Sequence, residues 1–472
     1  MLGAPLMAGV ASAATVRVDR ATKYQTIEGF GFFGARDVWW SPAERLVDPA
    51  WASLAIDDLG VTMWRNEYYP PGEGQDADWI KQRPVALALR DQARLSGVPL
   101  KTIVTVWSAP AQMKCASDRD AVHEGKPHHG GTKGGGAVCA GRREEFAQWL
   151  IDGLRLYANS GIDVYGLSFQ NEPFFRHGFN SSQYPQSAYV EMLETLGPKL
   201  HAVFPELKLF GSENMLEIEC GKNDLEFDPW WYTGKILSRP KALAQLGAFA
   251  VHGYSDGVQA TSTSKVARLW KQYHSAVAHT QRPIWMTETS GYVDGWEGGF
   301  NAKGEKRPGA FDLAQAIFSA LYYGKVSAWV WWQGSSSESA SEFSLMQGTT
   351  VGRRYYASKH FYRFIRPGAR MLATTSDDRD VLAVAFEHER IGNFTVVVLN
   401  LSQREKSLAL EGHGVPRTLN AHVTTGTRIL GATGSAVERN AIELPPRSVT
   451  TLIHGSYLDR PPRQVAAPAQ TN

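Results

Sequence analysis

Two glutamates stand at the ends of apolar, β-rich segments that lie far apart in the chain. Glu172 follows the run Gly-Leu-Ser-Phe-Gln-Asn, and Pro173 stops the strand directly after it. Glu288 ends a second run, Pro-Ile-Trp-Met-Thr-Glu. Two carboxylates on opposite sides of one bond can serve as a general acid and a nucleophile, which is what cleavage of a glycosidic bond requires. The pair indicates this chemistry if the fold brings the two strand ends together.

The segments that must position this pair alternate between β-rich runs and helical patterns. Strands are predicted for eight runs: Ile27–Gly34, Val61–Glu67, Lys101–Trp107, Val164–Asn171, Leu207–Glu213, Ala248–Tyr254, Pro283–Glu288 and Val326–Trp332. Helical patterns such as Val85–Leu95, Arg143–Ala158 and Ser187–Val203 separate them. Eight strand–helix units predict a parallel, closed (β/α)8 barrel, a TIM barrel. By count, Glu172 closes strand four and Glu288 strand seven, across the mouth of the barrel from each other.

After Pro367 the pattern changes to short alternating runs with turn residues between them. Strands are predicted for Val381–Glu387, Asn393–Leu399, Ser407–Leu410, Asn420–Val423 and Ser448–Ile453. These indicate an antiparallel side β-sandwich, which the strand-like segment Thr15–Arg20 is expected to join. The predicted division is therefore a leader at 1–13, the N-terminal strand of the sandwich at 14–26, a catalytic barrel at 27–366, the sandwich at 367–456, and a disordered tail at 457–472.

Composition limits the classes of partner. With 49 basic and 47 acidic residues the net charge is +2, so there is no electrostatic case for nucleic acid or an anionic membrane. No apolar run is long enough for a membrane span. The 15 Trp and 17 Tyr suit the flat faces of sugar rings, although many such residues pack in cores. The start ends in Ala11-Ser12-Ala13, typical of signal-peptidase cleavage, without a preceding basic residue. A secreted or periplasmic protein is expected.

The cysteines and histidines leave two questions open. A bond between Cys115 and Cys139 would staple one long loop, and the alternative is three unpaired thiols, Cys220 included. The same glycine-rich loop, 115–141, carries His123, His128 and His129, whose spacing matches no metal motif. No metal or cofactor is therefore predicted.

Several motifs between residues 15 and 455 resemble glycoside hydrolase family 30, retaining β-glycosidases of the large (β/α)8 clan. They are Gly29-Phe30-Gly31, Trp107-Ser108-Ala109-Pro110 with Met113-Lys114, Gln170-Asn171-Glu172-Pro173, His252-Gly253-Tyr254, Trp285-Met286-Thr287-Glu288, and Lys359 to Gly368. The resemblance implies a barrel with a side sandwich built from both chain termini. It also implies a polysaccharide or oligosaccharide substrate.

The resemblance assigns a role to each matching residue. Glu172 corresponds to the acid/base and Glu288 to the nucleophile, which Arg65 supports. The remaining substrate-binding candidates are Trp107, His252, Tyr254 and Trp332, with Asn171 as a donor to a sugar hydroxyl. A rim ion pair for Arg65 and core packing for Trp107 are the structural alternatives. Strand alternation lets only one of Trp331 and Trp332 face inward, and the sequence leaves that choice open. A double displacement further requires a raised pKa for Glu172 and a normal or lowered one for Glu288.

Departures from the family pattern reduce the number of candidate substrates. Phe32 follows Gly31, and Ala109 stands where relatives have proline. The segment 333–338 holds none of the basic residues that grip a glucuronate branch, which leaves linear xylan, β-1,6-galactan and β-1,6-glucan. Long loops at 66–80, 113–142 and 213–232 predict an extended groove and endo action. The alternatives are a non-catalytic carbohydrate-binding barrel, another glycosidase of the clan, and an exo-acting, glycosylceramide-type enzyme. The sequence predicts no oligomeric state.

Overall fold

Eight parallel strands close into a barrel in the computed structural model of the chain. The structure describes residues 13–34, 48–68, 76–115, 135–175, 181–221, 230–254, 260–335, 342–431 and 434–456. In barrel order the strands are β2 (Gly29–Phe33), β3 (Met63–Glu67), β4 (Lys101–Thr105), β6 (Val164–Ser168), β8 (Lys208–Met215), β9 (Leu246–His252), β10 (Ile284–Glu288) and β13 (Val326–Trp331). All eight predicted barrel strands are confirmed, each within a few residues of its expected ends.

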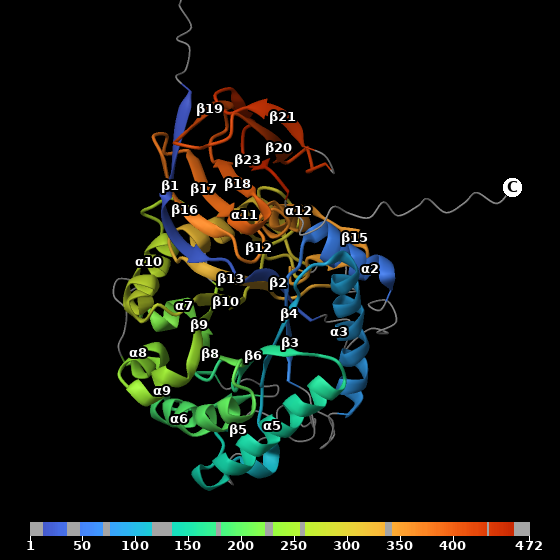
Figure 1. Cartoon of the computed structure of the whole chain (residues 1–472), viewed down its shortest axis with the longest axis vertical. Helices are drawn as coiled ribbons and strands as arrows, with labels where there is room; N and C mark the ends of the chain where they lie inside the picture. The colour runs from blue at the N-terminus through green and yellow to red at the C-terminus, as the bar shows by residue number, and fades with distance from the viewer. Residues whose placement is uncertain are drawn as a thin grey trace, which may run out of the picture.

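Helices surround this barrel in the described part of the chain (Figure 1). The longer ones are α3 (Asp76–Ser96), α5 (Arg143–Asn159), α6 (Gln186–Val203), α10 (Lys265–Val277), α11 (Ala310–Tyr322) and α12 (Arg353–Tyr362). Shorter ones are α2 (Pro49–Ser53), the π-helix η2 (Leu54–Leu59), α7 (Leu216–Glu219), α8 (Tyr232–Leu237) and α9 (Pro240–Gln245). Short 3-10 turns lie at η3 (Ala111–Met113), η5 (Ala140–Arg142), η6 (Ala278–Thr280) and η7 (Glu389–Ile391).

Helix α10 shows how the sequence specifies these elements. The Ser264 side chain accepts a hydrogen bond from the backbone N–H of Ala267 and so caps the helix start. Its buried positions recur at helical spacing and face the barrel: Val266, Ala267, Leu269, Trp270, Tyr273 and Val277. Inside the barrel, side chains such as Ile103, Phe210 and Trp285 form a separate buried cluster. The lumen is therefore a packed core, and the chemistry is confined to the carboxyl ends of the strands.

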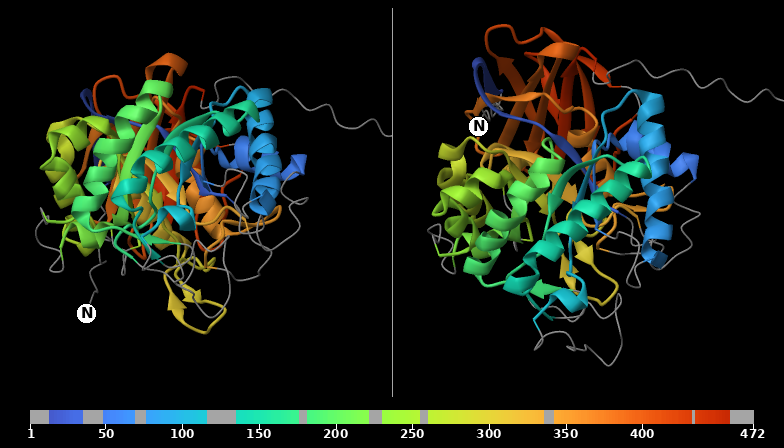
Figure 2. Two further views of the ribbon diagram at one scale, coloured as in Figure 1. Left: turned by 90° about the horizontal axis from the view of Figure 1, so that it is seen from below. Right: turned by 60° about the horizontal axis from the view of Figure 1, so that its bottom comes forward.

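A nine-stranded sheet with its own apolar core lies beside the barrel (Figures 1 and 2). It contains β1 (Ala14–Thr26), β16 (Arg370–Ser376), β17 (Val381–His388), β18 (Asn393–Asn400), β19 (Lys406–Glu411), β20 (Thr418–Thr424), β21 (Ser435–Glu438), β22 (Ile442–Leu444) and β23 (Ser448–His454). The strand order is β21-β20-β23-β18-β17-β16-β1-β19-β22. Apolar side chains from both halves of this order pack into one cluster, so the sheet folds over on itself as a sandwich.

Strand β1 joins this sheet as expected, and its pairing adds a feature that the sequence did not predict. It runs antiparallel to β16 but parallel to β19, so the sandwich is not wholly antiparallel. A parallel pair needs a long connection, and here that connection is the whole barrel. Strands β16, β21 and β22 were also not predicted.

Helix α12 connects the two parts. Its His360 is fully buried, with its ring nitrogens 2.8 Å from the hydroxyls of Thr451 on β23 and Thr424 on β20. Burial lowers the pKa of His360 well below its usual range, and His422 and Lys359 act in the same direction. The neutral ring thus ties the barrel to the sandwich through two hydrogen bonds.

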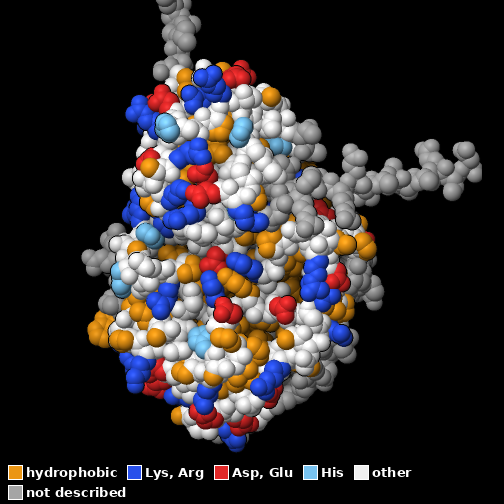
Figure 3. Space-filling view, in the orientation of Figure 1, with side chains coloured by type: hydrophobic (Ala, Val, Ile, Leu, Met, Phe, Trp, Pro, Cys, Tyr) orange, Lys and Arg blue, Asp and Glu red, His pale blue; other side chains and the backbone are white. Residues whose placement is uncertain are grey.

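Three two-stranded ribbons complete the described elements: β5 (Gly135–Gly136) with β7 (Ser182–Gln183), β11 (Gly299–Phe300) with β12 (Lys306–Arg307), and β14 (Met346–Gln347) with β15 (Thr350–Val351). The β11–β12 hairpin, yellow in Figure 2, projects from the barrel. On the face in Figure 3, basic side chains lie among acidic ones, in keeping with the near-neutral net charge. Among the described helices, none combines the length and apolarity needed to cross a bilayer.

Candidate active site

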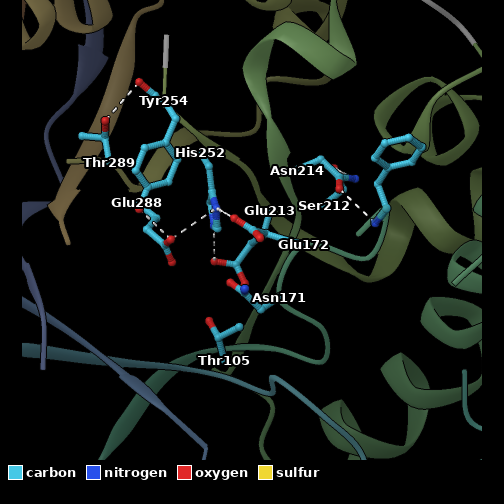
Figure 4. A network of polar contacts seen from close by, with 12 residues as sticks. Thr105, Asn171, Glu172, Ser212, Glu213, Asn214, His252, Tyr254, Glu288 and Thr289 are labelled. Carbon is cyan, nitrogen blue, oxygen red and sulfur yellow. Dashed lines mark hydrogen bonds and ion pairs between the residues drawn. The ribbon is translucent and has the colours of Figure 1, made fainter. Parts of the chain in front are cut away.

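The fold brings Glu172 and Glu288 together at the carboxyl ends of the strands (Figure 4). Glu288 is the last residue of β10, and Glu172 lies just beyond β6. One oxygen of each carboxylate and one ring nitrogen of His252 all lie within 4.8 Å of one another. Both glutamates are buried, with 5% and 6% of their surface exposed. Glu172 has φ 43°, a left-handed conformation that a non-glycine residue adopts at a cost and that is common at functional sites.

Both oxygens of Glu288 are held by hydrogen bonds. Nη1 of Arg65 lies 2.6 Å from Oε2, and the hydroxyl of Tyr254 donates to Oε1 at 2.8 Å. Burial raises the pKa of Tyr254 well above its usual range, and Glu288 raises it further, so this hydroxyl keeps its proton. The carboxylate therefore has a fixed orientation and a cation beside it, as a nucleophile requires.

Arg65 lies at the centre of a buried network and not in a rim ion pair. It has no exposed surface, and its Nη2 donates to Asn171 at 2.8 Å and to Glu213 at 3.0 Å. Its Nε is 3.3 Å from the hydroxyl of Thr105. Burial lowers the pKa of Arg65, but Glu213 and Glu288 outweigh that effect and raise it. The planar fork of a guanidinium suits such multiple contacts.

His252, on β9, contacts the other candidate carboxylate. Its Nδ1 is 2.8 Å from Oε1 of Glu172 and 3.8 Å from Oε1 of Glu288. Burial lowers the pKa of this imidazole, but the charge of Glu288 and the contacts with Glu172 and Glu213 raise it to about 9. His252 is therefore protonated at neutral pH, and its N–H groups face carboxylates.

Glu213 is a third carboxylate of this site that the sequence analysis missed. It lies on β8, is fully buried, and has φ 59°. Its Oε1 accepts from Arg65 and is 3.8 Å from Nε2 of His252. A signal was present, because Glu213 ends the predicted fifth strand just as Glu172 and Glu288 end theirs. Unlike them, it lies in none of the motifs on which the family resemblance was based.

An aromatic group adjoins the carboxylates and decides between the two candidate tryptophans. Ring centroids of Trp332 and Phe33 are 4.1 Å apart, and those of Trp332 and Trp107 are 5.9 Å apart. Trp107 in turn lies under Arg65, whose Cζ is 4.8 Å from its ring centroid. Trp331 is fully buried, and its indole N–H donates to the carbonyl of Phe343 at 2.8 Å. Trp332 is therefore the residue on the active-site side.

Known proteins resemble this chain in sequence and in fold. No protein-family profile matches the chain. The glucuronoxylanase XynC of Bacillus subtilis (strain 168) is 25% identical over 314 residues, which is 65% of either chain, so the match covers less than two thirds of that relative. The endo-1,6-β-D-glucanase neg1 of Aspergillus fumigatus is 25% identical over 265 residues, 53% of this chain and 47% of that one.

Two solved structures match over nearly the whole chain. A family 30 endoxylanase from Clostridium papyrosolvens C71 has a TM-score of 0.69 at 18% identity, covering 94% of this chain and 100% of that one. The family 30 subfamily 8 xylanase Xyn30A from Clostridium acetobutylicum gives 0.70 at 19%, with the same coverage. The fold is that of glycoside hydrolase family 30. The resemblance expected from the motifs is thereby confirmed.

The charges in this site argue against a metal. Among the described residues, Glu172, His252 and Glu288 are the three whose donor atoms are close enough to share an ion. A guanidinium already lies 2.6 Å from Glu288, however, and a protonated imidazole has no lone pair to offer. The group therefore fits proton transfer better than metal binding. His123, His128 and His129 lie outside the described residues. So do residues 1–12, the tail 457–472 and, within the three predicted long loops, residues 69–75, 116–134 and 222–229.

The loop after strand three of the barrel is closed by a disulfide. Cys115 and Cys139 are bonded to each other, whereas Cys220 is buried and takes part in no disulfide. The sequence left open a Cys115–Cys139 disulfide or three unpaired thiols, and the structure has the disulfide. The bond fastens both ends of a segment that starts on the active-site face of the barrel.

Proposed function

We propose that the protein is a retaining, endo-acting β-glycoside hydrolase of a polysaccharide, with xylan or a β-1,6-linked galactan or glucan as substrate. The observation that carries the proposal is the spacing of Glu172 and Glu288, whose nearest oxygens lie within 4.8 Å. Carboxyl groups about 5 Å apart are typical of retaining enzymes, whereas inverting enzymes need about 6.5 to 9.5 Å to admit a water. Such a spacing favours retention over inversion.

In the first step Glu288 attacks the anomeric carbon while Glu172 gives its proton to the leaving glycosidic oxygen. A covalent ester between the sugar and Glu288 results. In the second step Glu172 takes a proton from water, which attacks the same carbon and releases Glu288. Arg65 and Tyr254 hold the attacking carboxylate in place, and His252 contacts the carboxyl that exchanges the proton.

The substrate class rests on the relatives and on one loop. The curated relatives are named for glucuronoxylan and for β-1,6-glucan. Residues 333–338, Gln-Gly-Ser-Ser-Ser-Glu, contain no basic side chain for a glucuronate branch. This favours linear xylan or a β-1,6-linked polymer. Trp107 and Trp332 offer flat faces for sugar rings next to the carboxylates. Export, which Ala11-Ser12-Ala13 suggests, suits an enzyme whose substrate is an extracellular polymer.

The test is product release from glucuronoxylan, linear xylan, β-1,6-galactan and β-1,6-glucan. Wild type is compared with Glu172→Gln, Glu288→Gln and a matched control, Glu28→Gln. Glu28 is also a paired carboxylate, bonded to Lys208 and Tyr165, but it lies before β2 at the opposite end of the barrel. We expect one polymer to yield a ladder of oligomers, abolished in both active-site variants and kept in the control.

Other outcomes contradict parts of this proposal. A single small sugar from the earliest time point would indicate exo action. NMR of the first-formed anomer must show the β form, and an α product would exclude retention. Binding of one polymer without cleavage of any would favour the non-catalytic barrel.

A further inference from the structure

We propose that Glu213 is a positioning residue for the acid/base of this reaction, because it keeps a proton on His252 while Glu172 carries its own. This inference rests on the proposed function. Glu213 has no exposed surface, so it cannot touch a substrate and must act through its neighbours. Those neighbours are Arg65, at 3.0 Å, and His252, at 3.8 Å.

The imidazole of His252 lies between two glutamates. Nδ1 is 2.8 Å from Glu172, and Nε2, on the other side of the ring, points to Glu213. At 3.8 Å the second contact is a charge interaction and not a hydrogen bond. The negative charge of Glu213 stabilises the hydrogen on Nε2, while Nδ1 lies at hydrogen-bond distance from Glu172 and carries the second ring hydrogen. The two groups then titrate as a coupled pair.

A count of charges shows why a third carboxylate is needed. The ionisable groups around His252 come from five strands: Arg65 on β3, Glu172 after β6, Glu213 on β8, Tyr254 after β9 and Glu288 on β10. Tyr254 is neutral. In the form ready to react, Glu172 is protonated and Glu288 is not. The cations on Arg65 and His252 then balance the anions on Glu213 and Glu288, so the buried site has no net charge.

Without Glu213, a site with both Glu172 and His252 protonated would have a net positive charge, which a buried site disfavours. One proton would then be lost at lower pH, from the coupled pair of His252 and Glu172. The other groups that face Glu213 do not replace its charge, since they are the hydroxyls of Ser168 and Tyr189. Glu213 is thus the group that lets acid and imidazole be protonated together.

The experiment compares Glu213→Gln and Glu213→Asp with wild type and with Glu28→Gln. The first readout does not need activity: the titration of His252 followed by NMR of the labelled imidazole, assigned through His252→Asn. Wild type should titrate at a pKa of about 9. Removal of one neighbouring anion should lower that value by roughly 1 to 3 pH units. Glu213→Asp keeps the charge and should give a smaller shift in the same direction, and the control none.

The second readout is the pH profile of kcat/KM on the polymer that wild type cleaves. A general acid works only while protonated, so the alkaline limb should move to lower pH in Glu213→Gln and largely recover in Glu213→Asp. A profile that falls in height without moving, with an unchanged His252 titration, would mean that Glu213 only supports the fold and would overturn the proposal.

The two proposals fail separately. If wild type cleaves nothing, the proposed function fails, yet the titration of His252 still decides whether Glu213 holds its proton. If Glu213→Gln does not fold, Glu213→Met, which also removes the charge, is titrated in its place, and an unshifted His252 value there overturns the role assigned to Glu213.

Discussion

Tyr254 donates a hydrogen bond to Oε1 of Glu288 at 2.8 Å, and Arg65 holds the other oxygen of the same carboxylate. Tyr254→Phe should therefore lower kcat by roughly 10- to 100-fold and leave KM nearly unchanged, because the lost bond orients the attacking group. Steady-state kinetics on the cleaved polymer measure this. Tyr322→Phe is the control, since it removes a hydroxyl that bonds to the Thr374 carbonyl far from the site. Equal kinetics in the two variants would rule out the orienting role.

Arg65→Met should unfold more easily than wild type as well as lose activity. The change leaves Glu213 and Glu288 buried without their cation, and loss of one partner from a buried ion pair costs about 3 to 5 kcal/mol. Urea unfolding at neutral pH measures the loss, which should shrink in acid, where Glu213 takes up a proton. Arg65→Lys keeps the charge but cannot reach Glu288, Asn171 and Glu213 together, so its activity should fall with a smaller loss of stability. An Arg65→Met variant as stable as wild type would contradict this account.

His360 should make the junction between barrel and sandwich sensitive to acid. Its pKa is lowered in the folded state, so the unfolded chain binds a proton first as the pH falls below about 6.5. The stability that neutral His360 provides is therefore present above that pH and lost below it, at about 1.4 kcal/mol per pH unit while the folded ring stays neutral. Unfolding free energies at pH 7 and 5 should differ less in His360→Gln than in wild type. His413→Gln, at an exposed position, should behave as wild type.

Reduction of the Cys115–Cys139 bond should destabilise the protein by about 3.4 kcal/mol, the loop-closure value for a separation of 24 residues. Cys139→Ser should show the same loss without reductant. Thiol labelling after denaturation should modify one cysteine in the oxidised protein, which is the buried Cys220. Three labelled thiols before reduction would contradict the bond.

Periodicity and strand ends were sufficient to predict the barrel and its two main carboxylates. Apolar runs such as Val164–Asn171 and Pro283–Glu288 are buried over most of their length, and such nearly continuous apolar runs are how parallel strands are recognised in a sequence. Counting those strands placed Glu172 and Glu288 across one mouth, and the structure has them there.

What the sequence could not predict depends on contacts between distant segments. Glu213 acquires its place only from Arg65, on another strand, and from His252, on a third. The choice of Trp332 over Trp331 was decided by packing partners, Phe33 for the first and Phe343 for the second. The parallel register of β1 with β19 likewise has no local signal, because hydrophobic alternation does not specify the direction of a neighbouring strand.

That register has a consequence for how the chain is made. Arg17 on β1 pairs with Glu411 on β19, 394 positions later. At about 5 to 20 residues per second, a ribosome takes roughly 20 to 80 s to supply the second strand. All eight barrel strands leave the ribosome within that interval and can fold while β1 waits with its edges unpaired. Strand β1 is thus synthesised first but completes its pairing last, when β19 is available. A chaperone that shields β1 until then should raise the yield of folded protein.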